Sequence, residues 1–243
     1  AAKLQHQQEI QLKKLKDDAK SKLPSNAIGI YKKRTWEDEI DKQKKDGDIT
    51  TQLNLAKDQY LSETKKDAKS KLPNNIGSYN KAKWEDKLND QNSEETVATQ
   101  LNEAKAEHLS ETIKDAIKKL PPNDIGLYKK TTWEDAIKSQ TNIDNVIPNL
   151  DEGKEWYLRE IIKDAIKKLP DSVGTYDKAK WEGIIKQQTI AENVQGELDD
   201  AILNHQLQQT IEEGKTDAIS KLPMNTVGTY NKAKWETTIK IQT

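Results

Sequence analysis

The sequence predicts an all-α protein, an elongated tandem array of three-helix bundles in which long helices are shared between adjacent repeats. First, the phrase Asp-Ala-x-x-Lys-Leu-Pro, then Ile/Val-Gly-x-Tyr, then Trp-Glu occurs five times in 243 residues. Second, the segments between one Trp and the next Leu-Pro carry apolar residues at helical spacing. Third, 33% of residues are hydrophobic and 33% are charged, which is typical of thin, well-solvated helical bundles.

The first predicted helix of each repeat ends at Leu-Pro, because proline lacks an N–H donor and disfavours helical geometry in the residue before it. The glycine that follows suits a loop position with positive φ. The repeated aromatic residues are predicted to form the core of each bundle rather than a ligand platform. They are Tyr31, Tyr79, Tyr128, Tyr176 and Tyr230, and Trp36, Trp84, Trp133, Trp181 and Trp235.

A second, short helix is predicted to begin after each tyrosine. Asn80, Asp177 and Asn231 are good N-caps for it, and a Tyr before the cap can pack on the Trp at the fourth helical position. In the third repeat, Thr131 and Glu134 suggest a capping box, whereas Lys32 of the first repeat caps poorly.

The third helix of each repeat is predicted to continue into the first helix of the next. In the second repeat the apolar pattern runs from Val97 to Leu120 without a breaker. The predicted segments are a partial long helix (1–17), repeats 1 to 3 (18–66, 67–114 and 115–163), a long repeat 4 (164–216) and a truncated repeat 5 (217–243). We therefore expect a fragment of a longer array.

The fourth long helix carries five extra residues, since Leu198 precedes Asp217 by 19 positions whereas Leu101 precedes Asp115 by 14. Five residues rotate a helix face by about 140°, so a bend, a bulge or a changed twist is expected there. Gly214 is the candidate hinge.

Composition argues against several classes of function. The 40 basic residues balance 41 acidic ones, so no electrostatic footprint for nucleic acid is visible. No apolar run is long enough to insert into a membrane. There is no cysteine, and the three histidines lie far apart, so we expect no metal site, no cofactor and no enzymatic activity.

The candidates for partner binding are Trp156, Tyr157 and Arg159. Trp156 falls where the second repeat has Glu107 and the first has Gln59, so an aromatic side chain replaces a polar one on a helix surface. The alternative is that Trp156 packs against an adjacent loop or repeat unit, helped by the small Gly153.

Two segments, Asn231-Lys232-Ala233-Lys234 and Ile143-Asp144-Asn145-Val146-Ile147 with Leu150 downstream, resemble parts of known bacterial modules. These are the three-helix repeats of surface proteins of low-GC bacteria, which include albumin-binding modules, and the variable adherence antigens of mycoplasmas. The Leu-Pro, Ile-Gly and Tyr/Trp signature departs from the albumin-binding modules, so albumin binding is not carried over.

The resemblance implies a non-enzymatic surface adhesin or stalk that binds or projects toward host molecules. The expected partner is a host surface or serum protein, and the chain itself is expected to be a monomeric rod at the cell surface. The alternative is an intracellular spectrin-like scaffold or spacer rod.

Overall fold

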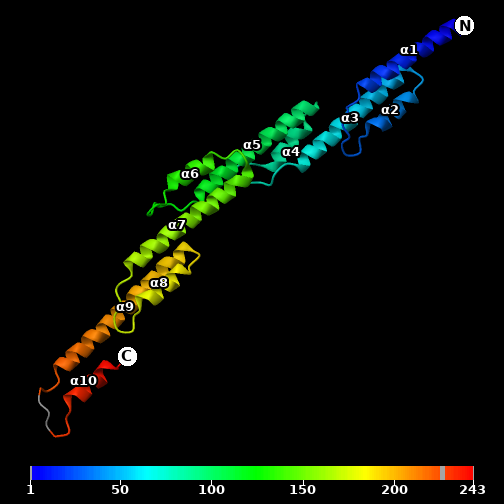
Figure 1. Ribbon diagram of the computed structural model, residues 1–243. Coiled ribbons are helices and arrows are strands. Elements are labelled where there is room, and N and C mark those ends of the chain that lie inside the picture. The colour runs from blue at the N-terminus through cyan, green and yellow to red at the C-terminus, as the bar shows by residue number, and fades with distance from the viewer. Residues whose placement is uncertain (1, 225–227, 243) are drawn as a thin grey trace. The chain divides into compact units, whose positions relative to one another are not determined.

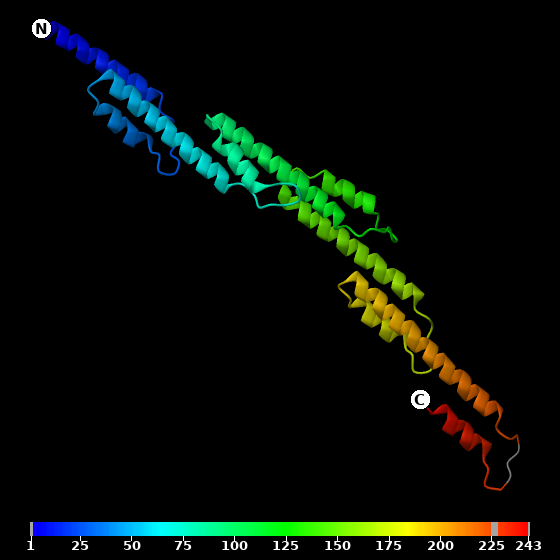
Figure 2. The ribbon, with the colours of Figure 1, turned by 180° about the vertical axis from the view of Figure 1, so that it is seen from behind.

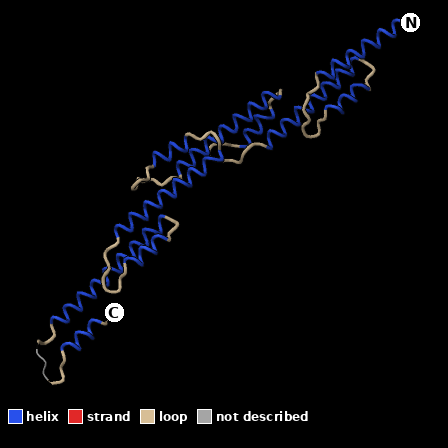
Figure 3. Tube along the Cα trace, viewed as in Figure 1, coloured by secondary structure: helices blue, strands red, loops and turns tan. Residues whose placement is uncertain are grey.

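The computed structural model of the protein describes residues 2–224 and 228–242, and these ranges are all α, with no strand (Figures 1 and 3). The chain divides into two compact units, 1–115 and 116–243, which are described separately. The helices in the described ranges are α1 (Ala2–Ser21), α2 (Lys33–Asp41), α3 (Asp46–Ser70), α4 (Lys81–Asn89), α5 (Glu94–Lys118), α6 (Lys130–Lys138), the 3-10 turn η1 (Ile143–Asn145), α7 (Val146–Lys168), α8 (Lys178–Lys186), α9 (Ala191–Ser220) and α10 (Lys232–Lys240).

Each stretch between a short Trp-containing helix and the next Leu-Pro is one uninterrupted long helix, as the apolar spacing predicts. These helices are α3, α5, α7 and α9, with 25, 25, 23 and 30 residues. The extra residues of the fourth repeat lengthen α9, and the α-helix runs through Gly214 without a π or 3-10 turn. A Cβ at Gly214 would meet nothing within 4 Å. The hinge at Gly214 stays a prediction.

In the first unit, α1, α2 and α3 pack together, and the C-terminal end of α4 lies beside the last turns of α3 (Figures 1 and 2). One buried cluster joins the end of α1, the following loop, α2 and the first half of α3 through Ala19, Tyr31, Ile40 and Ala56. A second cluster begins at Ala68, near the end of the same α3. One continuous helix therefore contributes to two successive cores.

In the second unit, one buried cluster is made of residues at the same repeat positions as the clusters of the first unit. It includes Ala165 from the end of α7, Tyr176 from the loop, Ile185 from α8 and Val194 and Leu198 from α9. Because α2, α4 and α8 each offer only two apolar residues to their clusters, these cores are thin, in agreement with the low hydrophobic content of the sequence.

The loop after each Leu-Pro contains a tight turn. Tyr31 donates its N–H to the carbonyl of Ile28 at 2.8 Å, and the same pairing joins Ile76 to Tyr79, Ile125 to Tyr128 and Val173 to Tyr176. The glycine at the first central position has a φ between 51° and 54° in these four turns. A residue with a side chain follows at negative φ, a pattern typical of a type II′ turn.

The short helices are capped in two ways. The side chains of Asn80, Asp177 and Asn231 accept backbone N–H bonds from the first turn, as predicted, and Lys32 makes no side-chain cap. The capping box predicted at Thr131 and Glu134 is wrong, because α6 begins at Lys130 and Thr131 already lies inside it. The Lys130 N–H instead donates 2.9 Å to Asp124 Oδ1, an acceptor six residues earlier.

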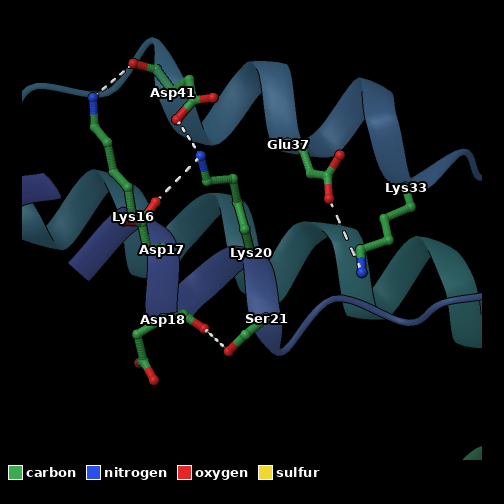
Figure 4. Close-up of polar contacts among 8 residues, drawn as sticks. All are labelled: Lys16, Asp17, Asp18, Lys20, Ser21, Lys33, Glu37 and Asp41. Carbon is green, nitrogen blue, oxygen red and sulfur yellow. Dashed lines mark hydrogen bonds and ion pairs between the residues drawn. The ribbon is translucent and has the colours of Figure 1, made fainter. Parts of the chain in front are cut away.

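The C-terminal end of α2 is held by two lysines from α1. Lys16 Nζ lies 2.6 Å from the Asp41 carbonyl oxygen and Lys20 Nζ lies 2.8 Å from Asp41 Oδ1 (Figure 4). Cations are stabilising at a helix C-terminus, where carbonyl groups lack partners within the helix. Lys65 and Lys69 make the corresponding contacts with Asn89 at the end of α4.

The repeated aromatic residues differ in burial. Tyr31, Tyr79, Tyr128 and Tyr176 are at most 2% exposed, whereas only Trp84 among the repeated tryptophans is fully buried. Trp36, Trp133 and Trp181 lie half-buried at the edge of their cores. Trp235 of the fifth repeat is 51% exposed, and no described helix lies over it as α3 lies over Trp36, so the prediction that it is a core residue stays a prediction.

Candidate functional site

The tight turn of the second repeat is locked by a carboxylate from the following long helix. Glu111 Oε2 accepts the Ser78 N–H at 3.0 Å, and Glu111 Oε1 pairs with Lys114 Nζ at 2.6 Å. The carboxylate sits where a side chain at Gly77 would be, since a Cβ there would lie 2.3 Å from Glu111 Oε2. Glycine at this position therefore allows both the positive φ and the close approach of the glutamate.

The same lock is present in the third repeat and altered in the fourth. Glu160 Oε2 accepts the Leu127 N–H at 3.0 Å, and Glu160 Oε1 lies 2.6 Å from Lys163 Nζ. In the fourth repeat the neutral Gln208 takes this place and accepts the Thr175 N–H at 3.3 Å. The lock thus works with a carboxylate or an amide oxygen.

The carboxylates of these locks are held in the charged form. The Lys114 ammonium and the Ser78 N–H lower the pKa of Glu111 from 4.5 to about 2. The Lys163 ammonium and the Leu127 N–H likewise lower the pKa of Glu160. Hydrogen bonds to an ionised carboxylate favour that form over the protonated acid.

Each buried tyrosine of the turn packs edge-on against one ring from the following long helix. The ring centroids are 5.0–5.2 Å apart and the planes meet at 72–83°, which is a favourable aromatic geometry. The pairs are Tyr31 with Tyr60, Tyr79 with His108, Tyr128 with Tyr157, and Tyr176 with His205. Burial lowers the pKa of His108, which is consistent with a neutral packing role for this imidazole.

The three predicted partner-binding residues lie on α7 but do not share one environment. Tyr157 is half-buried against Tyr128, so its ring belongs to the core of its repeat. Trp156 is half-buried, and the exposed Arg159 places its guanidinium carbon 5.9 Å from the Trp156 ring centroid, within cation–π range. Arg159 also pairs with Glu155 at 3.3 Å.

Trp156 takes the place of a hydrogen-bond acceptor. In the first two repeats the tryptophan indole N–H of the short helix donates to this position: Trp36 to Gln59 at 2.7 Å and Trp84 to Glu107 at 3.1 Å. Gly153, one turn earlier, is buried, and a Cβ there would lie 3.1 Å from Trp133. Gly153 therefore lies close to Trp133 of the same repeat, and the alternative that Gly153 helps Trp156 to pack stays a prediction.

A shallow hollow of about 690 Å³ lies beside these residues in the second unit. It is bounded by α7, the Leu-Pro loop before α6 and the start of α9, and its apolar wall includes Leu120, Pro121, Leu158, Ile161 and Ile190. Tyr157 and Glu155 also line it, whereas Trp156 and Arg159 do not. The surface of α7 therefore presents Trp156 and Arg159 on one side and an apolar hollow on another.

The hollow and the turn locks are the site features that the sequence-based reasoning missed. The locks had a readable signal, because an acidic or amide residue follows each of the first four turn glycines at a fixed distance of 34 residues: Glu63 after Gly29, Glu111 after Gly77, Glu160 after Gly126 and Gln208 after Gly174. The hollow had no signal in the sequence, since its walls come from two helices and a loop that lie together only in the folded chain.

Within residues 2–224 and 228–242, no cluster of three or more His, Asp or Glu side chains is placed to hold a metal ion. No helix in the same ranges is both long and apolar enough to cross a bilayer. Comparison of the chain with family models, curated proteins and solved structures gave no match.

Proposed function

We propose that this chain is the non-enzymatic repeat region of a bacterial surface protein that acts as an adhesin or stalk. In this proposal the five repeats form an elongated tandem array of three-helix bundles that share their long helices. The thin cores and the continuous long helices support this arrangement. The repeated side chains are used for packing and loop locking, which leaves no assembled set of reactive groups on the described surface.

The observation that carries the binding role is Trp156. This ring stands where two other repeats place a polar acceptor, it is only half-buried, and it lies next to the exposed Arg159. Tryptophan and arginine are enriched among the residues that dominate binding energy at protein interfaces. A host surface or serum protein is the proposed partner, and Trp156 with Arg159 is the proposed anchor.

The test is capture of partners from serum and from epithelial-cell extract by the immobilised chain, compared with Trp156→Ala and Asn204→Ala. Asn204 is the matched control, because it occupies the same repeat position in α9 and is exposed. We expect the wild-type chain and Asn204→Ala to retain one and the same partner, and Trp156→Ala to lose at least nine-tenths of it.

Equal capture by all three chains would refute Trp156 as the anchor. No capture by any of them would favour a passive spacer over an adhesin. Surface exposure is tested separately by protease treatment of intact cells: protection of the chain together with a cytosolic partner would favour the alternative, an intracellular spectrin-like scaffold.

A further inference from the structure

The apolar hollow beside α7 has a counterpart in the first unit with which it can be compared residue by residue. Repeats 1 and 2 match repeats 3 and 4 with a constant shift of 97 residues: Gly29 with Gly126, Tyr60 with Tyr157, and Val97 with Val194. The shift carries the residues around Tyr60 onto residues that line the hollow. Differences between the two surroundings therefore show what the hollow has lost and gained.

In the first unit, the hydroxyl of Tyr60 is bound by a carboxylate. It donates a hydrogen bond of 2.8 Å to Oε1 of Glu94, the first residue of α5. The Tyr60 ring packs edge-on against Tyr31, with the centroids 5.0 Å apart. Burial and the hydrogen bond to Glu94 raise the pKa of Tyr60. The glutamate thus satisfies the polar end of a ring whose face lies in the core.

In the second unit, this carboxylate is missing. Tyr157 keeps the edge-on packing, here against Tyr128 at 5.2 Å, but Ala191 takes the place of Glu94 as the first residue of the long helix. Tyr157 and Ala191 both line the hollow. No described residue forms a hydrogen bond with the Tyr157 hydroxyl. The hollow therefore offers a donor whose counterpart in the first unit binds a glutamate.

The walls of the hollow are more apolar than their counterparts. At the shift of 97 residues, Pro122, Ile161 and Ile190 replace Ser25, Thr64 and Ser93. Ile190 is 52% exposed, so this aliphatic side chain still has surface to bury. Because burial of apolar surface is favourable, the hollow suits an aliphatic side chain beside the group that reaches the tyrosine hydroxyl.

The charged residues at the rim leave one ammonium group available. Lys119 and Lys154 line the hollow together with Glu155 and Glu192. Glu155 is already paired with Arg159 at 3.3 Å, whereas Lys154 is exposed and forms no ion pair with a described residue. A carboxylate that enters the hollow therefore meets both a hydroxyl donor and a lysine.

We propose that the hollow binds a glutamate side chain that is flanked by aliphatic residues, in a segment of a partner protein. The glutamate accepts a hydrogen bond from the Tyr157 hydroxyl, as Glu94 does from Tyr60, and a neighbouring aliphatic side chain lies against the apolar wall. The group that fills this place in the first unit is a glutamate within a chain, which favours an internal residue over a chain end. The site is separate from the anchor at Trp156, which does not line the hollow.

The test titrates acetyl-Leu-Glu-Leu-amide, which has no charged end, into the isotope-labelled chain by NMR. The amide signals of Leu158, Ile190 and Ala191 should shift. Binding should be about tenfold tighter than for acetyl-Leu-Gln-Leu-amide, because a charged acceptor strengthens the hydrogen bond. Trp156→Ala should bind both peptides as the wild type does, which separates this site from the proposed anchor.

Two results of the titration would overturn the proposal. One is the absence of shifts at these three residues. The other is tighter binding of acetyl-Leu-Ala-Leu with a free terminal carboxylate than of the glutamate peptide, which would assign the hollow to chain ends instead.

Tyr157→Phe tests the hydroxyl, because it removes this group and leaves the ring on Tyr128. The preference for the glutamate peptide over the glutamine peptide should fall from about tenfold to less than about threefold. The free energy of unfolding should stay unchanged, since no described residue bonds to the hydroxyl. A preference equal to that of the wild type would overturn the proposal.

Ala191→Glu tests the position by supplying a carboxylate from the chain itself, where Glu94 stands in the first unit. It should occupy the Tyr157 hydroxyl and weaken binding of the glutamate peptide about tenfold. The matched control is Asn193→Glu, which adds the same charge at an exposed position of α9 about 200° further round the helix. The control should bind within about twofold of the wild type, because exposed charges interact weakly. Equal weakening by both variants would reveal general charge repulsion and overturn the proposal.

Discussion

Three glycine-to-alanine substitutions separate the backbone contribution of the turn from its carboxylate lock. Gly77 has positive φ and faces the Glu111 carboxylate. Gly228 has positive φ but nothing within 4 Å. Gly214 lies inside α9 with open space around it. Gly77→Ala therefore introduces both backbone strain and a clash with a carboxylate, Gly228→Ala introduces backbone strain alone, and Gly214→Ala introduces neither.

The expected free energies of unfolding follow from these differences. Gly228→Ala should cost about 1–2 kcal/mol, the usual penalty of a left-handed conformation for a residue with a Cβ. Gly77→Ala should cost more, because its Cβ would lie 2.3 Å from Glu111 Oε2 and must displace the carboxylate from the Ser78 N–H. Gly214→Ala should stabilise α9 by up to about 1 kcal/mol, since alanine is the better helix former.

Amide hydrogen exchange by mass spectrometry measures these changes locally, in peptides covering residues 76–89, 205–220 and 228–240. Exchange should accelerate more than tenfold in the first peptide of Gly77→Ala and roughly 5- to 30-fold in the third peptide of Gly228→Ala, given tenfold per 1.4 kcal/mol. It should slow in the second peptide of Gly214→Ala. Equal effects of Gly77→Ala and Gly228→Ala would refute the lock, and faster exchange in Gly214→Ala would contradict an ordinary helical glycine there.

Three further predictions concern the same repeats. Because the pKa of Glu111 is depressed in the folded state, the stabilising contribution of its carboxylate is present above pH 4.5 and is lost as the pH falls toward about 2. In NMR titrations the amide signal of Ser78 should shift in that pH window. The amide signal of Thr175, which is bonded to the neutral Gln208, should not shift. Tyr128→Phe removes a 3.1 Å hydrogen bond to the Pro121 carbonyl and should lower the free energy of unfolding by about 0.5–1.5 kcal/mol in denaturant titrations. Tyr79→Phe removes a buried hydroxyl that has no hydrogen-bond partner and should leave the free energy of unfolding unchanged or raise it. A larger loss of stability in Tyr79→Phe than in Tyr128→Phe would contradict the hydrogen-bond assignment. Burial raises the pKa of Tyr128 to about 12, so the contribution of its neutral phenol to stability should be lost between about pH 10 and 12. Phenolate formation, followed by ultraviolet absorbance, should coincide with unfolding in this pH range.

Much of the fold could be read from local patterns. Leu-Pro ends helices because the proline ring removes the backbone N–H donor. The apolar residues from Val97 to Leu120 recur at the spacing of one continuous helix, so α5 was predictable. The cap of α6 was not, because Asp124 reaches Lys130 only after the intervening turn has folded.

The candidate site was predictable in part. Trp156 stands out by comparing equivalent repeat positions, and the same comparison would have revealed the glutamates that lock the turns. Tyr157 shows the weakness of judging by residue type alone: it neighbours Trp156 in sequence, yet its ring packs on Tyr128 in the core. Side chains one position apart on a helix face different directions, so two neighbouring aromatic residues can have separate roles.

The long helices pass without a break from one core to the next, and a distance measurement within α3 tests this directly. In a chain without cysteine, Thr51→Cys and Ser70→Cys place two spin labels on exposed positions of this helix. Electron-spin distance spectroscopy should give a narrow distribution with a backbone separation of about 29 Å, from 19 residues at about 1.5 Å each. A broad distribution, or one centred well below that separation, would show that α3 is interrupted between the two cores.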